Sequence, residues 1–172
     1  MMLDVGVEAD AEWDSSTDWA RLAEAAALAA IAESRFPSLA NGPRNVELSV
    51  RLTDDEAVRA LNAHWRGKDK ATNVLSFPLS DAEELASFDN AAGGPELMLG
   101  DIVLARGVCV AEAADKALPI DAHAAHLLVH GTLHLLGYDH GDDGAAEDME
   151  AREVRALARL GFADPYALEE AA

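Results

Sequence analysis

The chain is organised around the stretch HGTLHLLGYDH at residues 130–140. His130 and His134 are four residues apart, so on an α-helix they lie one above the other on the same face. That spacing lets two imidazoles bind one ion at roughly 2.0–2.1 Å, the usual zinc–nitrogen distance. Gly137 is expected to end the helix, because glycine tolerates the left-handed conformation common just after a helix. The chain then turns, and His140 can return as a third ligand.

Three protein ligands leave a fourth position open for water or substrate, which is typical of a catalytic zinc site. We therefore predict one Zn²⁺ per chain on His130, His134 and His140, because three imidazoles suit zinc or a similar late first-row metal. The alternative is a set of packing or surface histidines. A histidine pair four residues apart is weak evidence, because it also occurs by chance. The third histidine, beyond a helix-ending glycine, favours the metal site.

The neighbours of these ligands predict a buried helix. Apolar residues surround it almost completely, and His123 and His126 continue its histidine face. His126 is either a packing histidine or a hydrogen-bonding group that orients a ligand or a nearby carboxylate. Gly131 stands where the metalloprotease motif H-E-x-x-H has its glutamate base, so peptide hydrolysis is disfavoured. Glycine costs about 1 kcal/mol inside a helix, so close packing or substrate approach requires it.

Composition restricts the class of protein. At 172 residues, half of them hydrophobic, the chain is expected to form one domain over residues 1–172 and is not a disordered chain. The single cysteine, Cys109, cannot form an internal disulfide and indicates a reducing compartment. The N-terminal residues do not resemble a signal peptide, and no apolar run approaches the ~18 residues of a membrane span. We therefore expect a cytoplasmic protein.

A net charge of −19 argues against a general nucleic-acid binder. Positive charge is nevertheless concentrated in Arg66-Gly67-Lys68-Asp69-Lys70. Arg66 can bind a phosphate bidentately, whereas the alternative is an ordinary helix C-terminus, which favours positive charge. Trp65, beside it, either stacks on a base or belongs to the apolar stripe of its helix.

The hydrophobic pattern predicts an α+β fold, a small mixed sheet covered by helices with a central metal-binding helix. Capping motifs start two of the helices, a Ser/Thr run before residue 18 and a capping box over residues 53–56. Residues 79–96 are acidic and are expected to form a loop. Strands are expected near residues 3–7, 46–52, 73–77 and 100–105, and helices near 18–33, 53–67, 107–117, 119–136 and 145–160.

Three segments together resemble a known family. HGTLHLLGYDH, with LNAHWRGKDKATNVLSFP at residues 61–78 and LGDIVLA at residues 99–105, resembles the YbeY-type bacterial endoribonucleases, which are rRNA maturation factors. The resemblance spans roughly residues 45–145 and implies the same α+β architecture, with about four strands. It assigns a functional role to the arginine at position 66, so Arg66 and His130 are the predicted catalytic residues.

The resemblance implies a metal-dependent, single-strand-directed endoribonuclease. Its expected role is cytoplasmic rRNA maturation, including 16S rRNA 3′ end processing, and ribosome quality control. The expected partners are single-stranded RNA or rRNA and the small ribosomal subunit with its proteins, with no membrane and no DNA. Either a ribose 2′-OH or a metal-activated water can attack the phosphorus, and both routes build charge that a cation must stabilise.

Two alternatives remain. One is a non-catalytic ribosome-assembly factor with a structural metal, in which loss of a histidine ligand would unfold the chain. The other is a zinc hydrolase of peptides or small molecules, against which the glycine at position 131 counts.

Overall fold

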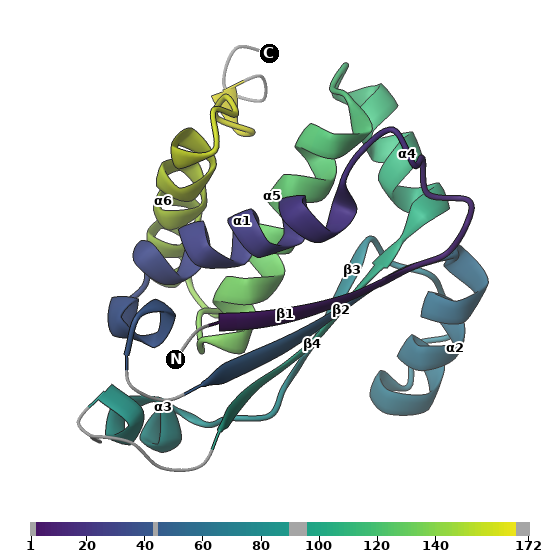
Figure 1. Cartoon of the computed structure of the whole chain (residues 1–172). Coiled ribbons are helices and arrows are strands. Elements are labelled where there is room, and N and C mark those ends of the chain that lie inside the picture. The colour runs from purple at the N-terminus through teal and green to yellow at the C-terminus, as the bar shows by residue number, and fades with distance from the viewer. Residues whose placement is uncertain (1–2, 43–44, 90–95, 168–172) are drawn as a thin grey trace.

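A four-stranded mixed sheet forms the centre of the computed structural model, which describes residues 3–42, 45–89 and 96–167 (Figure 1). The order across the sheet is β1-β2-β4-β3, with β1, β2 and β4 parallel and β3 antiparallel to β4. The predicted mixed sheet of an α+β fold is therefore confirmed. The strands are β1 (Leu3–Ala9), β2 (Val46–Thr53), β3 (Val74–Pro78) and β4 (Leu97–Ala105).

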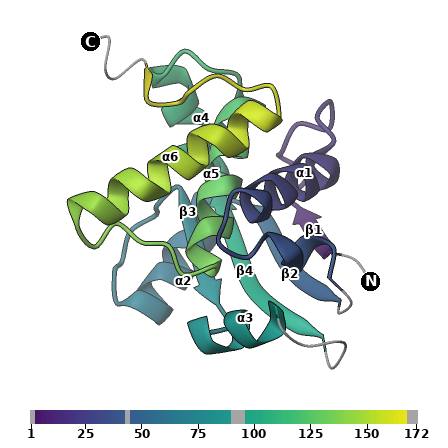
Figure 2. The same ribbon diagram turned by 90° about the vertical axis from the view of Figure 1, so that its left-hand side faces the viewer.

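Helices cover the two faces of the sheet unequally. Helices α1, α5 and α6 lie on one side, and α2 lies on the other (Figure 1). Helix α5 packs against β3 and β4 and also against α6, which crosses it in Figure 2. No helix among the described residues is long and apolar enough to cross a membrane. The helices are α1 (Trp19–Ala32), α2 (Asp55–Arg66), α3 (Ala82–Asp89), α4 (Arg106–Asp115), α5 (Ile120–Leu135) and α6 (Asp143–Arg159), with a 3₁₀ helix η1 (Pro37–Ala40).

Helix α5 is the buried central helix that its apolar pattern predicts. Leu128, Leu133 and Leu135 are at most 1% exposed, and burying each such side chain contributes roughly 1.5–3 kcal/mol. Gly131 faces the sheet: a Cβ atom there would lie 3.0 Å from Ile102 Cγ2. Close packing of α5 on the sheet therefore accounts for this glycine.

Two helix starts differ from the expected caps. Thr53 stays in β2, where its hydroxyl donates to Asp10 Oδ2 at 2.7 Å, so the capping box predicted to begin there is wrong. The N-cap of α2 is Asp54, whose carboxylate accepts the Ala57 N–H at 2.7 Å. Asp18 caps α1 in the same way, instead of the serine and threonine residues before it. In both helices an aspartate next to the hydroxyl residue takes the cap.

The acidic stretch 79–96 is partly helical, so the loop predicted there is wrong for α3. The Asp81 carboxylate accepts the Glu84 N–H at 2.8 Å at the start of this helix. Leu85, only 1% exposed, anchors the helix in the core beside η1. One apolar residue in an acidic run is a weak sequence signal, and tertiary packing decides its structure. Residues 90–95 of the predicted loop lie outside the described residues.

Candidate metal centre

Three histidines converge where α5 ends. One ring nitrogen from each of His130, His134 and His140 lies within 4.8 Å of the others, in the only such cluster of three or more possible metal ligands in the described part of the chain. The ring centroids of His130 and His134 are 4.5 Å apart, and the His140 ring lies 5.0 Å from that of His130. All three line a cleft of about 630 Å³. The structure thus brings together the three residues that the spacing predicts as ligands.

The turn after α5 returns the chain to the site. Gly137 has a φ of +95°, and the Tyr138 N–H donates to the Leu133 carbonyl at 3.1 Å, which closes a Schellman motif. The Asp139 carboxylate accepts the His140 N–H at 2.8 Å, so Asp139 caps the turn. A local helix-ending motif therefore places the third histidine beside the first two.

Hydrogen bonds at the far nitrogens orient two of the imidazoles. His134 Nδ1 lies 2.8 Å from the Tyr138 carbonyl oxygen, which can only accept, so Nδ1 carries the proton. His130 Nδ1 lies 3.2 Å from a carboxylate oxygen of Glu153 and donates in the same way. In its neutral form, each ring therefore presents an unprotonated Nε2.

The two Nε2 atoms, of His130 and His134, are only 3.0 Å apart. Two lone pairs at that distance repel each other unless a cation lies between them, so this donor set fits a metal ion. The pKa of His134 is lowered, mainly by burial and to a lesser extent by the neighbouring His130. A lowered pKa keeps that imidazole neutral near pH 7, which is the protonation state that a metal ligand requires.

Glu153, which the sequence analysis missed, is a buried carboxylate behind His130. It is 0% exposed, and its Oε1 atom lies 2.7 Å from His126 Nε2 and 3.0 Å from the Tyr166 hydroxyl. Burial raises its pKa, but the hydrogen bonds from His126 and His130 outweigh that effect and lower the pKa to about 2. The carboxylate is therefore ionised at neutral pH.

A signal for Glu153 existed in the helical period. It lies on α6 four residues after the buried Met149 and three or four before the buried Ala156 and Leu157, so it occupies a core position of an otherwise polar helix. His126 takes the orienting role that was one of its two interpretations, toward a carboxylate. His123 instead pairs with Glu112 at 2.8 Å.

Arg66 lies at the C-terminus of α2 and lines the same cleft as the three histidines. Its guanidinium is 3.4 Å from the Ser76 carbonyl oxygen, and the residue is exposed. Gly67, with a φ of +69°, ends α2, and the Asn62 amide donates to the Lys70 carbonyl at 2.9 Å. These contacts hold the basic segment 66–70 next to the candidate metal centre.

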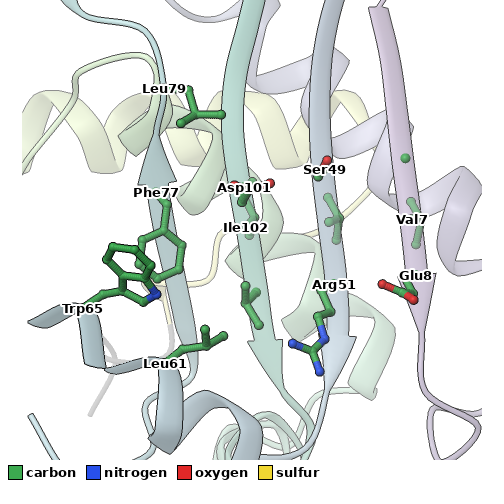
Figure 3. A pocket seen from close by; sticks show the side chains of 13 residues that line it. Val7, Glu8, Ser49, Arg51, Leu61, Trp65, Phe77, Leu79, Asp101 and Ile102 are labelled. Atoms are coloured by element: carbon green, nitrogen blue, oxygen red, sulfur yellow. The ribbon is translucent and has the colours of Figure 1, made fainter. Parts of the chain in front are cut away.

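Trp65 is 65% exposed, so the interpretation of this residue as part of a buried apolar stripe of its helix is wrong. Its side chain lines a second groove of about 680 Å³ on the sheet face that carries α2. Figure 3 shows its ring beside that of Phe77, with Leu79 and Asp101 further along the groove. Helix α2 packs on the sheet through Val58, and its last turn leaves the indole uncovered.

The fold and the site together define an α+β protein with a candidate three-histidine metal centre at the end of a central helix. The family model described as endoribonuclease YbeY matches residues 10–161, and the chain belongs to this family. The family resemblance of the three sequence segments is thus confirmed.

Relatives from several bacteria match almost the whole chain. A protein of Rhizorhabdus wittichii named endoribonuclease YbeY is 52% identical over 169 residues, which cover 98% of this chain and 99% of the relative. One of Sphingopyxis alaskensis with the same name is 53% identical over 166 residues, covering 96% and 98%. The solution structure of TM1509 from Thermotoga maritima has a TM-score of 0.53 at 20% identity, covers 93% of this chain and 92% of its own, and supports the fold alone.

Proposed function

We propose that the chain is a metal-dependent endoribonuclease that cuts single-stranded RNA during rRNA maturation, including 16S rRNA 3′ end processing. The observation that carries the proposal is the cleft that His130, His134, His140 and Arg66 share. Membership of a family whose relatives are named endoribonucleases supports RNA as the substrate.

The ion that fits best is zinc, one per chain, held by His130, His134 and His140. When bound, zinc supplies Lewis-acid stabilisation of a phosphoryl oxygen. Arg66 is exposed, and its guanidinium can exchange the long contact with the Ser76 carbonyl oxygen for a phosphate, which it can bind through two parallel hydrogen bonds. His130 is catalytic through the ion that it holds. Position 131 offers no carboxylate base, which favours RNA over peptides, because a ribose 2′-OH can serve as an internal nucleophile.

The net charge of the chain affects its binding to RNA. The net charge of −19 repels RNA at long range, so the intrinsic affinity for RNA is expected to be weak. The decrease of this affinity with salt concentration is expected to reflect the few phosphate contacts that Arg66 and its neighbours make. The small ribosomal subunit and its proteins would then supply localisation in the cytoplasm. We assign the activity to one domain over residues 1–172.

The same acidity favours one second candidate, a ribosome-assembly factor whose metal is structural. A structural metal predicts that His130→Ala unfolds the chain, whereas a catalytic metal predicts lost cleavage with a retained fold. Far-UV circular dichroism of the variant and the wild type distinguishes these two outcomes.

The direct test is cleavage of an end-labelled single-stranded RNA by the purified chain, with and without chelator. A His134→Ala sample purified identically reveals any contaminating nuclease. The proposal expects cleavage by the wild type, loss of cleavage with chelator, recovery with zinc and no cleavage by the variant. Equal cleavage by both samples, or by neither, contradicts it.

A further inference from the structure

A third, smaller cavity of about 150 Å³ lies behind the candidate metal centre, and His130 borders both this cavity and the cleft that the three histidines line. The rear cavity is lined by polar groups, among them His123, His126 and Tyr166. His130 thus has one edge toward the substrate cleft and the other toward a buried polar cluster. The group that binds His130 Nδ1 in the rear cavity therefore determines the direction in which Nε2 points.

One oxygen atom is the centre of that rear cluster. Glu153 Oε1 accepts from His126 Nε2 at 2.7 Å, from the Tyr166 hydroxyl at 3.0 Å and from His130 Nδ1 at 3.2 Å. The Tyr166 hydroxyl also lies 3.2 Å from His126 Nε2. The three donors come from α5 and from the segment after α6, so they fix the carboxylate from two directions.

Packing does not explain a carboxylate at this position. Its neighbours along the buried stripe of α6 are Met149, Ala156 and Leu157, and an apolar residue would continue that stripe. A fully buried carboxylate is unfavourable unless hydrogen bonds compensate for its lost hydration. The compensation here comes from three donors, and one of them is the His130 imidazole, whose other nitrogen faces His134.

We propose that Glu153 is a positioning residue for the metal centre. By accepting the His130 Nδ1 proton it fixes the tautomer and rotation of that imidazole, so that Nε2 faces His134 and the cleft. His126 and Tyr166 hold the carboxylate in place, which makes the segment after α6 part of the centre. The inference deepens the proposed function, because it rests on the metal proposed there.

The test is the affinity for zinc, measured by competition with a chelator on the full chain. Glu153→Gln keeps the shape but replaces the ionised acceptor by a neutral amide, and zinc affinity is expected to fall roughly 10-fold, toward the lower end of the 10–100-fold range for such partners. Glu153→Ala removes the acceptor and is expected near the upper end. Tyr166→Phe removes one supporting donor and should cause a smaller loss than Glu153→Gln.

Glu147→Gln is the matched control, since it removes the same charge from an exposed position on α6. Its zinc affinity should equal that of the wild type. Thermal unfolding of each metal-free variant separates positioning from a structural role, and the visible spectrum of the Co²⁺-loaded chain reports the ligand geometry. The proposal expects a changed spectrum for Glu153→Gln and an unchanged one for the control.

An unchanged zinc affinity in Glu153→Gln overturns the inference. So does a loss of metal-free stability with zinc affinity retained, because that result describes a structural carboxylate. Absence of zinc binding by the wild type overturns it as well. If the wild type binds zinc tightly and Glu153→Gln weakens that binding, but neither cuts RNA, the positioning role stands and the proposed nuclease activity fails.

Discussion

Gly100 is the position where one methyl group should cost most. It lies in β4 beside Pro78 of the antiparallel edge strand, has a φ of +143° and follows the register shift between β2 and β4. A Cβ atom there would overlap the Phe77 carbonyl oxygen and lie 2.9 Å from Leu135 Cδ2 on α5. Gly100→Ala therefore forces an unfavourable backbone conformation and displaces both a strand and α5.

The magnitude follows from these two effects. The backbone conformation costs about 1–3 kcal/mol, and overpacking costs about 1–3 kcal/mol more. Together they lower the free energy of unfolding by about 2–6 kcal/mol, and about 2–4 °C per kcal/mol for a chain of this size gives a fall in Tm of about 4–24 °C.

Thermal unfolding followed by circular dichroism measures this fall. Gly6→Ala is the control, because Gly6 is exposed on β1 and a Cβ atom there meets nothing within 4 Å. Its stability should change by no more than about 0.5 kcal/mol. Equal Tm values for Gly100→Ala and Gly6→Ala would refute the reasoning.

Three further predictions concern the site and the surface. Arg66→Glu should retain bound metal and lower RNA cleavage by about 10²-fold or more; a wild-type rate in a gel assay would remove Arg66 from the mechanism. Gly131→Ala gains about 1 kcal/mol of helix propensity but overpacks the core by about 1–3 kcal/mol, so its Tm should fall, and a higher Tm would contradict close packing. Arg155 and Arg159 lower the pKa of Glu33 below its ordinary 4.5, so its ionised form stabilises the fold above that pH. In urea unfolding, Glu33→Gln should therefore be less stable than the wild type at pH 7, with a difference that shrinks as the pH falls below 4.5; a difference independent of pH would contradict this.

The part of the site that the sequence predicts is the local part. His130 and His134 share a helix face through their spacing alone, and Gly137 ends the helix through its own conformational freedom. His140 follows within three residues, so no long-range packing is needed to place it. The apolar surroundings of these residues likewise predict a central helix.

The features that the sequence analysis missed depend on packing between distant segments. Glu153 reaches His130 across 23 residues, and only the packing of α6 on α5 turns this member of a charged run into a buried carboxylate. For Trp65 the prediction was wrong in the opposite direction. This apolar residue of the helix stripe stays exposed and lines a groove, because no other element packs over its side chain. Leu85 shows that one anchor in the core suffices to order a helix in an acidic stretch.

The central claim is that one metal ion on three histidines enables RNA cleavage. Its most direct test titrates zinc into the metal-free chain and follows bound zinc and cleavage of single-stranded RNA in the same samples. The account predicts that both rise together and reach saturation at one zinc per chain, with neither rising in His134→Ala. Full cleavage by the metal-free chain, or zinc saturation without cleavage, would contradict it.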